Sequence, residues 1–152
     1  MDLGPTDIAM RLGAAALAGA LIGINRDLAQ KPIGVRTLGL VALGAATVTV
    51  AAVQVQGMAE NADALSRVVQ GVIQGVMAGI SFIGAGVILR DAQTHTVEGL
   101  TTAASVWVTA ALGIACGLGA WTTVALALAV ALILLVAVAR LELLLDVKKP
   151  KK

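Results

Sequence analysis

Charged side chains are scarce in this sequence, and their scarcity indicates what class of protein it encodes. Only 13% of its 152 residues are Asp, Glu, Lys or Arg, whereas a soluble domain carries about a quarter. Hydrophobic residues make up 59%, the mean hydropathy is +0.94, and the charges fall between long apolar runs. This pattern predicts a membrane protein whose main partner is the lipid bilayer.

Aromatic residues, cysteine and histidine are also rare. With two tryptophans, one phenylalanine and no tyrosine, the chain lacks surfaces on which bases could stack, so we expect no nucleic-acid partner. The single cysteine, Cys116, cannot form an intramolecular disulfide, and one cysteine with one histidine makes no zinc-binding pattern. Since catalytic triads and phosphate-binding glycine loops are missing too, we expect no enzyme activity.

Five apolar segments approach the length of about 20 residues that a helix needs to cross a bilayer. They cover residues 7–24, 37–56, 68–89, 99–117 and 121–140. We therefore predict an all-α, polytopic membrane protein built as a bundle of five transmembrane helices. In this interpretation residues 1–140 form the transmembrane domain and residues 141–152 form a basic tail.

Lysines and arginines are distributed unequally between the two sides that five spans would define. Of the 11 Lys and Arg residues, all but Arg11 and Arg67 fall in the connections after the first and third segments, at the last residue of the fifth segment, or after it. Because cytoplasmic loops carry the excess of Lys and Arg, we predict the N-terminus outside and the C-terminus in the cytoplasm. Arg11 is expected to extend its side chain to the membrane surface.

Small residues at three- and four-residue spacing predict faces for close helix packing. In the third segment they are Gly71, Gly75 and Gly79, and we expect them to pack a homo-oligomer, most simply a dimer. In the first segment they are Ala9, Gly13, Ala16, Ala20 and Gly23.

A second face of the third segment is polar and carries Gln70, Gln74 and Ser81. We predict that this face forms a polar interhelix contact with the side of the fourth segment that carries hydroxyl groups, which includes Ser105. Two interpretations remain open for the glutamines. They form structural hydrogen bonds between helices, or they line a transport path.

Three carboxylates lie in the connections on the predicted cytoplasmic side: Asp27, Asp91 and Glu98. Oxygen ligands of this kind suit Mg²⁺, so they are the candidate metal ligands, and Mg²⁺ is the one cofactor considered. Arginines of the same connections, such as Arg36 and Arg90, would compete by forming ion pairs at the helix ends. The sequence leaves both interpretations open.

Two long stretches resemble the signatures of the MgtC/SapB family of membrane proteins. The first covers residues 23–27 and 34–46, with Gly23, Arg26 and Asp27 in its first part. The second runs from Gly79 to Ile88 and continues through residues 97–107 and 110–119.

This resemblance implies an inner-membrane protein with about five spans, associated with growth at low Mg²⁺ and with survival of bacteria inside host cells. It also implies a regulatory partner, since a well-discussed member is thought to restrain the F-type ATP synthase instead of transporting Mg²⁺. The chain departs from the family pattern at Asn25, where a Glu is usual, and at Leu38, where a His is frequent. Many members also carry a soluble domain after the last span, so we expect a short form.

The leading hypothesis is a non-enzymatic, virulence- and Mg²⁺-related membrane protein that binds another inner-membrane protein. Its predicted partner surface consists of Asp27, Arg36, Arg90, Glu98, Thr101 and Thr102. The alternative is a small cation or solute permease that works as a homo-oligomer. A third hypothesis, lipid handling at the inner leaflet, rests on the basic connections and tail.

Overall fold

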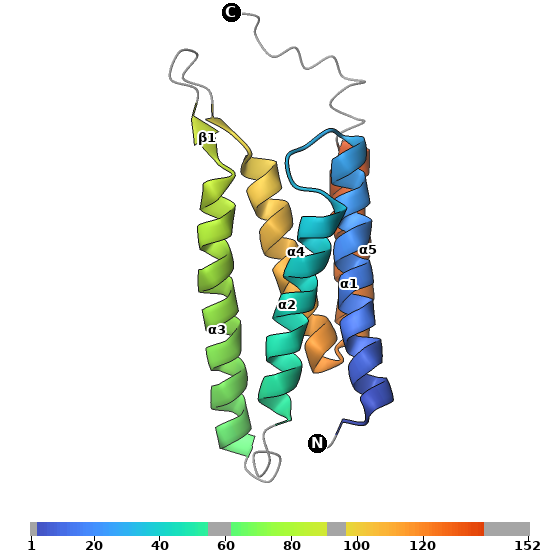
Figure 1. The fold of residues 1–152 in the computed structure, drawn as a ribbon, viewed down its shortest axis with the longest axis vertical. Helices are drawn as coiled ribbons and strands as arrows, with labels where there is room; N and C mark the ends of the chain where they lie inside the picture. Colours follow the sequence, from blue (N-terminus) through green and yellow to red (C-terminus); the bar gives the residue numbers. More distant parts are fainter. Residues whose placement is uncertain (1–2, 55–61, 91–96, 139–152) are drawn as a thin grey trace, which may run out of the picture.

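The computed structural model describes residues 3–54, 62–90 and 97–138, which fold as an elongated bundle of five helices (Figure 1). Its elements are α1 (Pro5–Leu28), α2 (Val35–Val53), α3 (Ala62–Gly86), β1 (Leu89–Arg90), β2 (Val97–Glu98), α4 (Leu100–Leu118) and α5 (Trp121–Ile133), which continues as a π-helix over Leu134–Val138. The prediction of an all-α bundle is confirmed. The only strands among these residues, β1 and β2, form a two-residue antiparallel pair that leads into α4.

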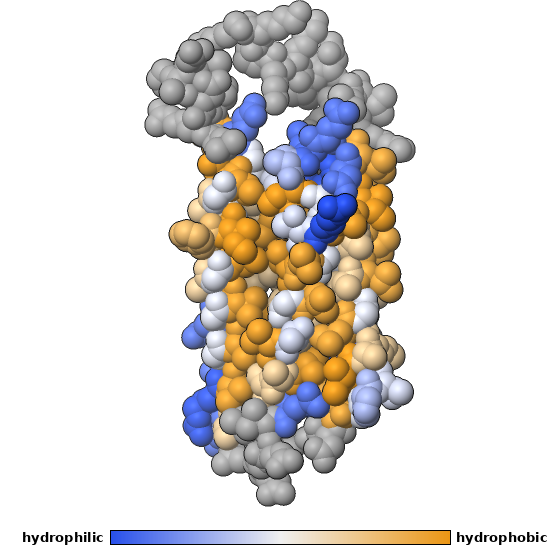
Figure 2. All heavy atoms as spheres, in the orientation of Figure 1, coloured by the Kyte–Doolittle hydropathy of each residue, from blue (hydrophilic) through white to orange (hydrophobic). Residues whose placement is uncertain are grey.

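Four of the helices are long and apolar enough to cross a membrane: α1, α2, α3 and α4. As an α-helix, α5 has only 13 residues, and it reaches a greater length through the π-helix that follows it. Figure 2 shows hydrophobic side chains over the middle of the visible face, with hydrophilic side chains towards its two ends. The protein is therefore a membrane protein, and the orientation of its termini stays a prediction.

Two helices extend beyond the segments expected from hydropathy. The first segment was expected to end at residue 24, but α1 continues to Leu28, and α3 starts at Ala62 instead of residue 68. In α1 the extra turn contains polar residues that the fold uses. Arg26 is buried against α4, and Asp27 accepts a hydrogen bond from α2, so the helix does not need to end where polarity begins.

The core is made by α1, α2 and α4, which approach one another closely through small residues. A Cβ atom at Gly113 of α4 would lie 2.9 Å from the Cβ of Ala45, and one at Gly117 would lie 2.6 Å from the Cβ of Thr49. On α1, a Cβ at Gly19 would lie 3.0 Å from the Cβ of Ala42. Close backbone contact of this kind is how helices associate where apolar burial gives little driving force.

The small-residue face predicted for α1 is confirmed only towards its C-terminal end, where Gly23 is buried and a Cβ atom there would lie 2.5 Å from the Cα of Val35. Ala9 and Gly13 are exposed, whereas the buried face contains Ala15, Ala18 and Gly19, together with Ile22. Alanine and glycine occur all around this helix, so their spacing alone did not identify the face that packs. Around this core, α3 packs on α4 and α2, and α5 packs mainly on α4, burying little beyond Val124.

Candidate functional site

Many of the predicted functional residues meet at the end of the bundle where α1 ends and where α2 and α4 begin (Figure 1). The centre of this end is Arg26, which is only 4% exposed and lies on the buried face of α1, one turn after Ile22. Its Nη2 donates a hydrogen bond to Oγ1 of Thr102 in the first turn of α4. Within the described ranges, the buried Nε of Arg26 has no hydrogen-bond partner.

Asp27 fixes the start of α2 by accepting a backbone hydrogen bond. Its Oδ2 accepts a hydrogen bond of 3.0 Å from the backbone N–H of Val35, one of the first-turn donors that a helix leaves without an internal partner. Gly34 permits this approach, because a Cβ atom at that position would collide with the Asp27 carboxylate. Asp27 therefore fixes the entry into α2, although its side chain remains exposed.

The start of α4 is set by Gly99, which precedes the helix with φ of 88°. This left-handed conformation favours glycine, and a Cβ atom here would also collide with the carbonyl oxygen of Val87. As a result, the strand pair turns directly into α4, which places Thr102 beside Arg26. No side chain of the described residues caps the first-turn amides of α4.

The predicted partner surface is brought to this end only in part. Asp27, Arg36, Glu98 and Thr101 are exposed there, in keeping with a surface role. Thr102 is 3% exposed and binds Arg26, so it supports the surface from beneath and is not part of it. The side chain of Arg90 and all of Asp91 lie outside the described part of the structure, as does the tail at 141–152.

The metal hypothesis gains no geometric support. Among residues 3–54, 62–90 and 97–138, no three side chains of His, Cys, Asp or Glu lie close enough to hold a metal ion. Of the three candidate ligands, Asp27 is engaged with Val35, Glu98 is exposed, and Asp91 is outside these ranges.

Arg11 lies at the opposite end of the bundle, and the expectation that it extends to the surface is wrong. Its side chain is 12% exposed and forms an ion pair with Asp7, with an Nη2–Oδ2 distance of 3.3 Å. Nη1 also donates a 2.8 Å hydrogen bond to the carbonyl oxygen of Gly117, in the last turn of α4. Cations are favourable at helix C-termini, where backbone carbonyls lack internal partners. The Arg11 side chain therefore binds the end of α4 and does not extend into solvent.

The polar face of α3 does not meet the side of α4 that carries hydroxyl groups. Gln70, Gln74 and Ser81 are exposed, and the Ser81 hydroxyl donates to the carbonyl oxygen of Met77 in its own helix. Ser105 is buried, and its hydroxyl likewise donates within its helix, to the carbonyl of Thr101. The interhelix contact predicted between these residues is therefore absent from the described part of the chain.

The glycine ridge of α3 is also open. A Cβ atom at Gly71, Gly75 or Gly79 would meet no atom of the described structure within 4 Å. The packing predicted for these residues therefore does not occur inside this chain, and their use in an oligomer stays a prediction.

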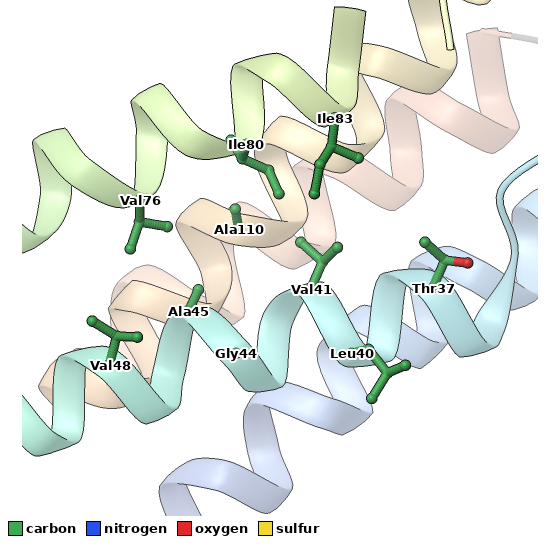
Figure 3. A pocket seen from close by; sticks show the side chains of 10 residues that line it. All are labelled: Thr37, Leu40, Val41, Gly44, Ala45, Val48, Val76, Ile80, Ile83 and Ala110. Atoms are coloured by element: carbon green, nitrogen blue, oxygen red, sulfur yellow. The ribbon is translucent and has the colours of Figure 1, made fainter. Parts of the chain in front are cut away.

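Between α2 and α3 lies an apolar groove of about 470 Å³ (Figure 3). Val41 and Val48 of α2 point towards Val76, Ile80 and Ile83 of α3, which leaves the middle of the groove without a polar side chain. Such a surface suits acyl chains or another apolar helix.

Comparison with known proteins gives a consistent result. Residues 12–144 match the model of the MgtC family. The chain belongs to the MgtC family. It is 45% identical over 122 residues to Protein SrpB of Synechococcus elongatus, covering 75% of this chain and 65% of that protein. No solved structure matches it.

Two further relatives are similar over nearly the same part of the chain. Protein MgtC of Salmonella typhimurium is 41% identical over 110 residues, which cover 72% of this chain and 43% of that protein. Protein SapB of Bacillus subtilis is 35% identical over 116 residues, which cover 74% of this chain and 48% of that protein. The match thus spans half or less of each of these two relatives.

Sequence reasoning missed the central residue of this MgtC-family site. Arg26 was predicted as part of the family signature and as a cation of the first connection that could pair with carboxylates there, whereas it is a buried partner of Thr102. The available signal was its spacing. Arg26 follows Gly19 and Ile22 at helical intervals, so it continues the buried face of α1.

Proposed function

We propose that this MgtC-family chain is a non-enzymatic protein of the bacterial inner membrane that supports growth at low Mg²⁺ by binding another membrane protein. The F-type ATP synthase is the partner that the family resemblance implies. The observation that supports this proposal is the polar end of the bundle, where Arg36, Glu98 and Thr101 are exposed around the buried pair Arg26–Thr102.

This end of the bundle is suited to binding a protein partner because its exposed residues belong to helix turns whose positions are fixed by hydrogen bonds and close packing. Arg36 is in the first turn of α2, whose start is fixed by the bond between Asp27 and Val35. Thr101 is in the first turn of α4, which is held by Arg26 and by the close packing of Gly113 against α2. Exposed charges on rigid elements give orientation and specificity to an interface.

The test is capture of a partner from native membranes after crosslinking, using the tagged chain in a host strain that lacks its own copy. The double variant Arg36→Glu/Glu98→Lys should reduce capture by about tenfold, a loss of about 1.4 kcal/mol in binding. Arg67→Glu, which reverses an exposed charge at the other end, is the control and should leave capture unchanged. Growth in limiting Mg²⁺ should follow capture.

If no membrane protein is captured and deletion leaves growth in limiting Mg²⁺ unchanged, the proposal is wrong. If the control variant loses capture as much as the double variant does, the interface lies elsewhere on the molecule.

A second candidate function is a small cation or solute permease that works as a homo-oligomer. It is favoured by Gln70 and Gln74, which are exposed on a helix long enough to cross the membrane, where amide groups need polar partners. A second copy packed on Gly71, Gly75 and Gly79 would bring two such faces together.

Flux into proteoliposomes tests this candidate, because a rate no higher than in empty vesicles for Mg²⁺ and other cations excludes it. Gly75→Leu tests the packing separately and should reduce the oligomer size in detergent. Gly13→Leu, at an equally open glycine on α1, is the matched control.

A further inference from the structure

The charge of Arg26 has no counter-charge in the described structure. Its guanidinium group is buried and always positive, yet its hydrogen-bond partner, Thr102, is a neutral hydroxyl. The adjacent carboxylate of Asp27 accepts the Val35 N–H, and the one ion pair among the described residues is Asp7–Arg11, at the far end of α1. A buried charge without compensation is unfavourable, so this site favours an anion.

The hydrogen bond between Arg26 and Thr102 lies at the N-terminus of α4. Thr102 is in the first turn of α4, where backbone N–H groups point outwards and the helix dipole is positive. Since no described side chain caps these amides, Arg26 adds a positive charge to an end that is already positive. The free amides and the unpartnered Nε are both donors of the kind that an oxyanion accepts from.

An apolar pocket of about 200 Å³ begins beside this cluster, between α1, α4 and α5. It is lined by Ile22, which lies one turn before Arg26 on the same face of α1, and by Thr101, the neighbour of Thr102. From there it extends along α4 to Val108 and along α5 to Ala131, which is towards the middle of the bundle. An anion site with an apolar pocket beneath it matches an amphiphile that bears a phosphate.

We propose that an anionic phospholipid binds here, with its phosphate between Arg26 and the first turn of α4 and one acyl chain in the pocket between α1, α4 and α5. Free inorganic phosphate would satisfy the charge but would leave the apolar pocket uncovered. Lys31 and Arg36, both exposed at this end, raise the local potential and favour an anionic headgroup over a zwitterionic one. The proposal goes beyond binding of a protein partner and does not depend on it.

The test uses the full chain purified in an uncharged maltoside detergent, with its apparent Tm followed as three probes are added. At a concentration about 100-fold above Kd, dioleoylphosphatidylglycerol should raise Tm by about 5 °C. Dioleoylglycerol has the same chains without the phosphate, and inorganic phosphate has the anion without the chains. Each of these should produce only a small part of the rise.

Two arginine variants locate the site. Arg26→Gln should lose most of the rise produced by phosphatidylglycerol. Arg67→Gln removes the same charge from an exposed position at the other end of the bundle and should keep it. Equal responses of the two variants would overturn the proposal. A full rise with inorganic phosphate alone, or with dioleoylglycerol alone, would overturn it as well, because the ligand would then be a simple ion or an uncharged lipid.

A third variant applies if Arg26→Gln does not fold. Ala104 is exposed and lines the pocket, so Ala104→Leu should fill the space proposed for the acyl chain and reduce the rise in Tm with phosphatidylglycerol. Ala125→Leu, at an exposed position of α5 outside the pocket lining, is its control. An unchanged rise in Ala104→Leu would exclude the pocket as the acyl-chain site.

Discussion

Helices α1 and α4 run antiparallel, and each end of the pair holds one arginine of α1 against one end of α4. Arg11 meets the C-terminal end, where it donates to the Gly117 carbonyl and pairs with Asp7. Arg26 meets the N-terminal end, where it donates to the Thr102 hydroxyl. The residue type and the pair of helices are the same, so the difference lies in the environments of the two charges.

At the Arg11 end, the helix dipole, the carbonyl and a carboxylate all favour a cation. At the Arg26 end, the dipole opposes a cation, and within the described residues the sole partner is a hydroxyl. The first arrangement stabilises the bundle as it stands, whereas the second is complete only with an anion from outside. The two ends should therefore respond differently to mutation.

The largest effect is expected at the Arg11 end from Gly117→Leu. A side chain here would collide with Thr49, whose Cβ lies 2.6 Å from the site of a new Cβ, and would displace the carbonyl that Arg11 binds. We expect the free energy of unfolding, measured by denaturant titration in mixed micelles, to fall by about 3 kcal/mol. Gly13→Leu, at an open glycine of α1, is the control, and an equal loss there would mean that the effect comes from the type of substitution.

Arg11→Met should have the next largest effect. It removes the ion pair with Asp7 and leaves the Gly117 carbonyl without its donor, so we expect a loss of about 2 kcal/mol in the same titration. Arg67→Met, at an exposed position of α3 at the same end, should change stability by less than about 0.5 kcal/mol. Similar values for the two variants would show that the contacts of Arg11 contribute no stability.

Hydropathy predicted the helices well, because span length and apolar content are local properties of the chain. The same reasoning failed for Arg11, whose carbonyl partner at Gly117 is more than a hundred residues away in sequence. No local pattern reports such a contact, so a cation near a helix end was assigned to the membrane surface.

For the candidate site and the helix packing around it, the sequence predicted the types of residue involved but not the contacts they make. Glycines that mark close packing were recognised as a class, yet Gly113 and Gly117 pack against α2 while Gly75 of α3 contacts no described residue. Which ridge is used depends on the tertiary arrangement, and glycine spacing does not encode it. For the same reason Thr102 was expected on the surface, although its hydroxyl meets the buried face of α1.

Thr102→Val examines the Arg26 end directly. Valine has nearly the same shape as threonine but offers no acceptor, so the Arg26 guanidinium would lose its one described partner. We expect the free energy of unfolding to fall by about 1–2 kcal/mol in detergent without anionic lipid. Thr47→Val, at an exposed threonine that bonds only to the Leu43 carbonyl of its own helix, should have almost no effect. A matching loss at Thr47 would mean that the hydroxyl of Thr102 contributes nothing specific.

The smallest effect, and the one that separates the two ends most clearly, is expected for Arg26→Met in lipid-free detergent. Methionine keeps an unbranched apolar side chain and removes a buried charge that lacks a counter-ion, so the relief of desolvation offsets the lost bond to Thr102. The free energy of unfolding should therefore change by less than about 0.5 kcal/mol, or rise, whereas Arg11→Met lowers it. Equal losses of unfolding free energy in Arg26→Met and Arg11→Met would contradict the proposed difference between the two ends, because the charge of Arg26 would then be as fully compensated inside the chain as that of Arg11.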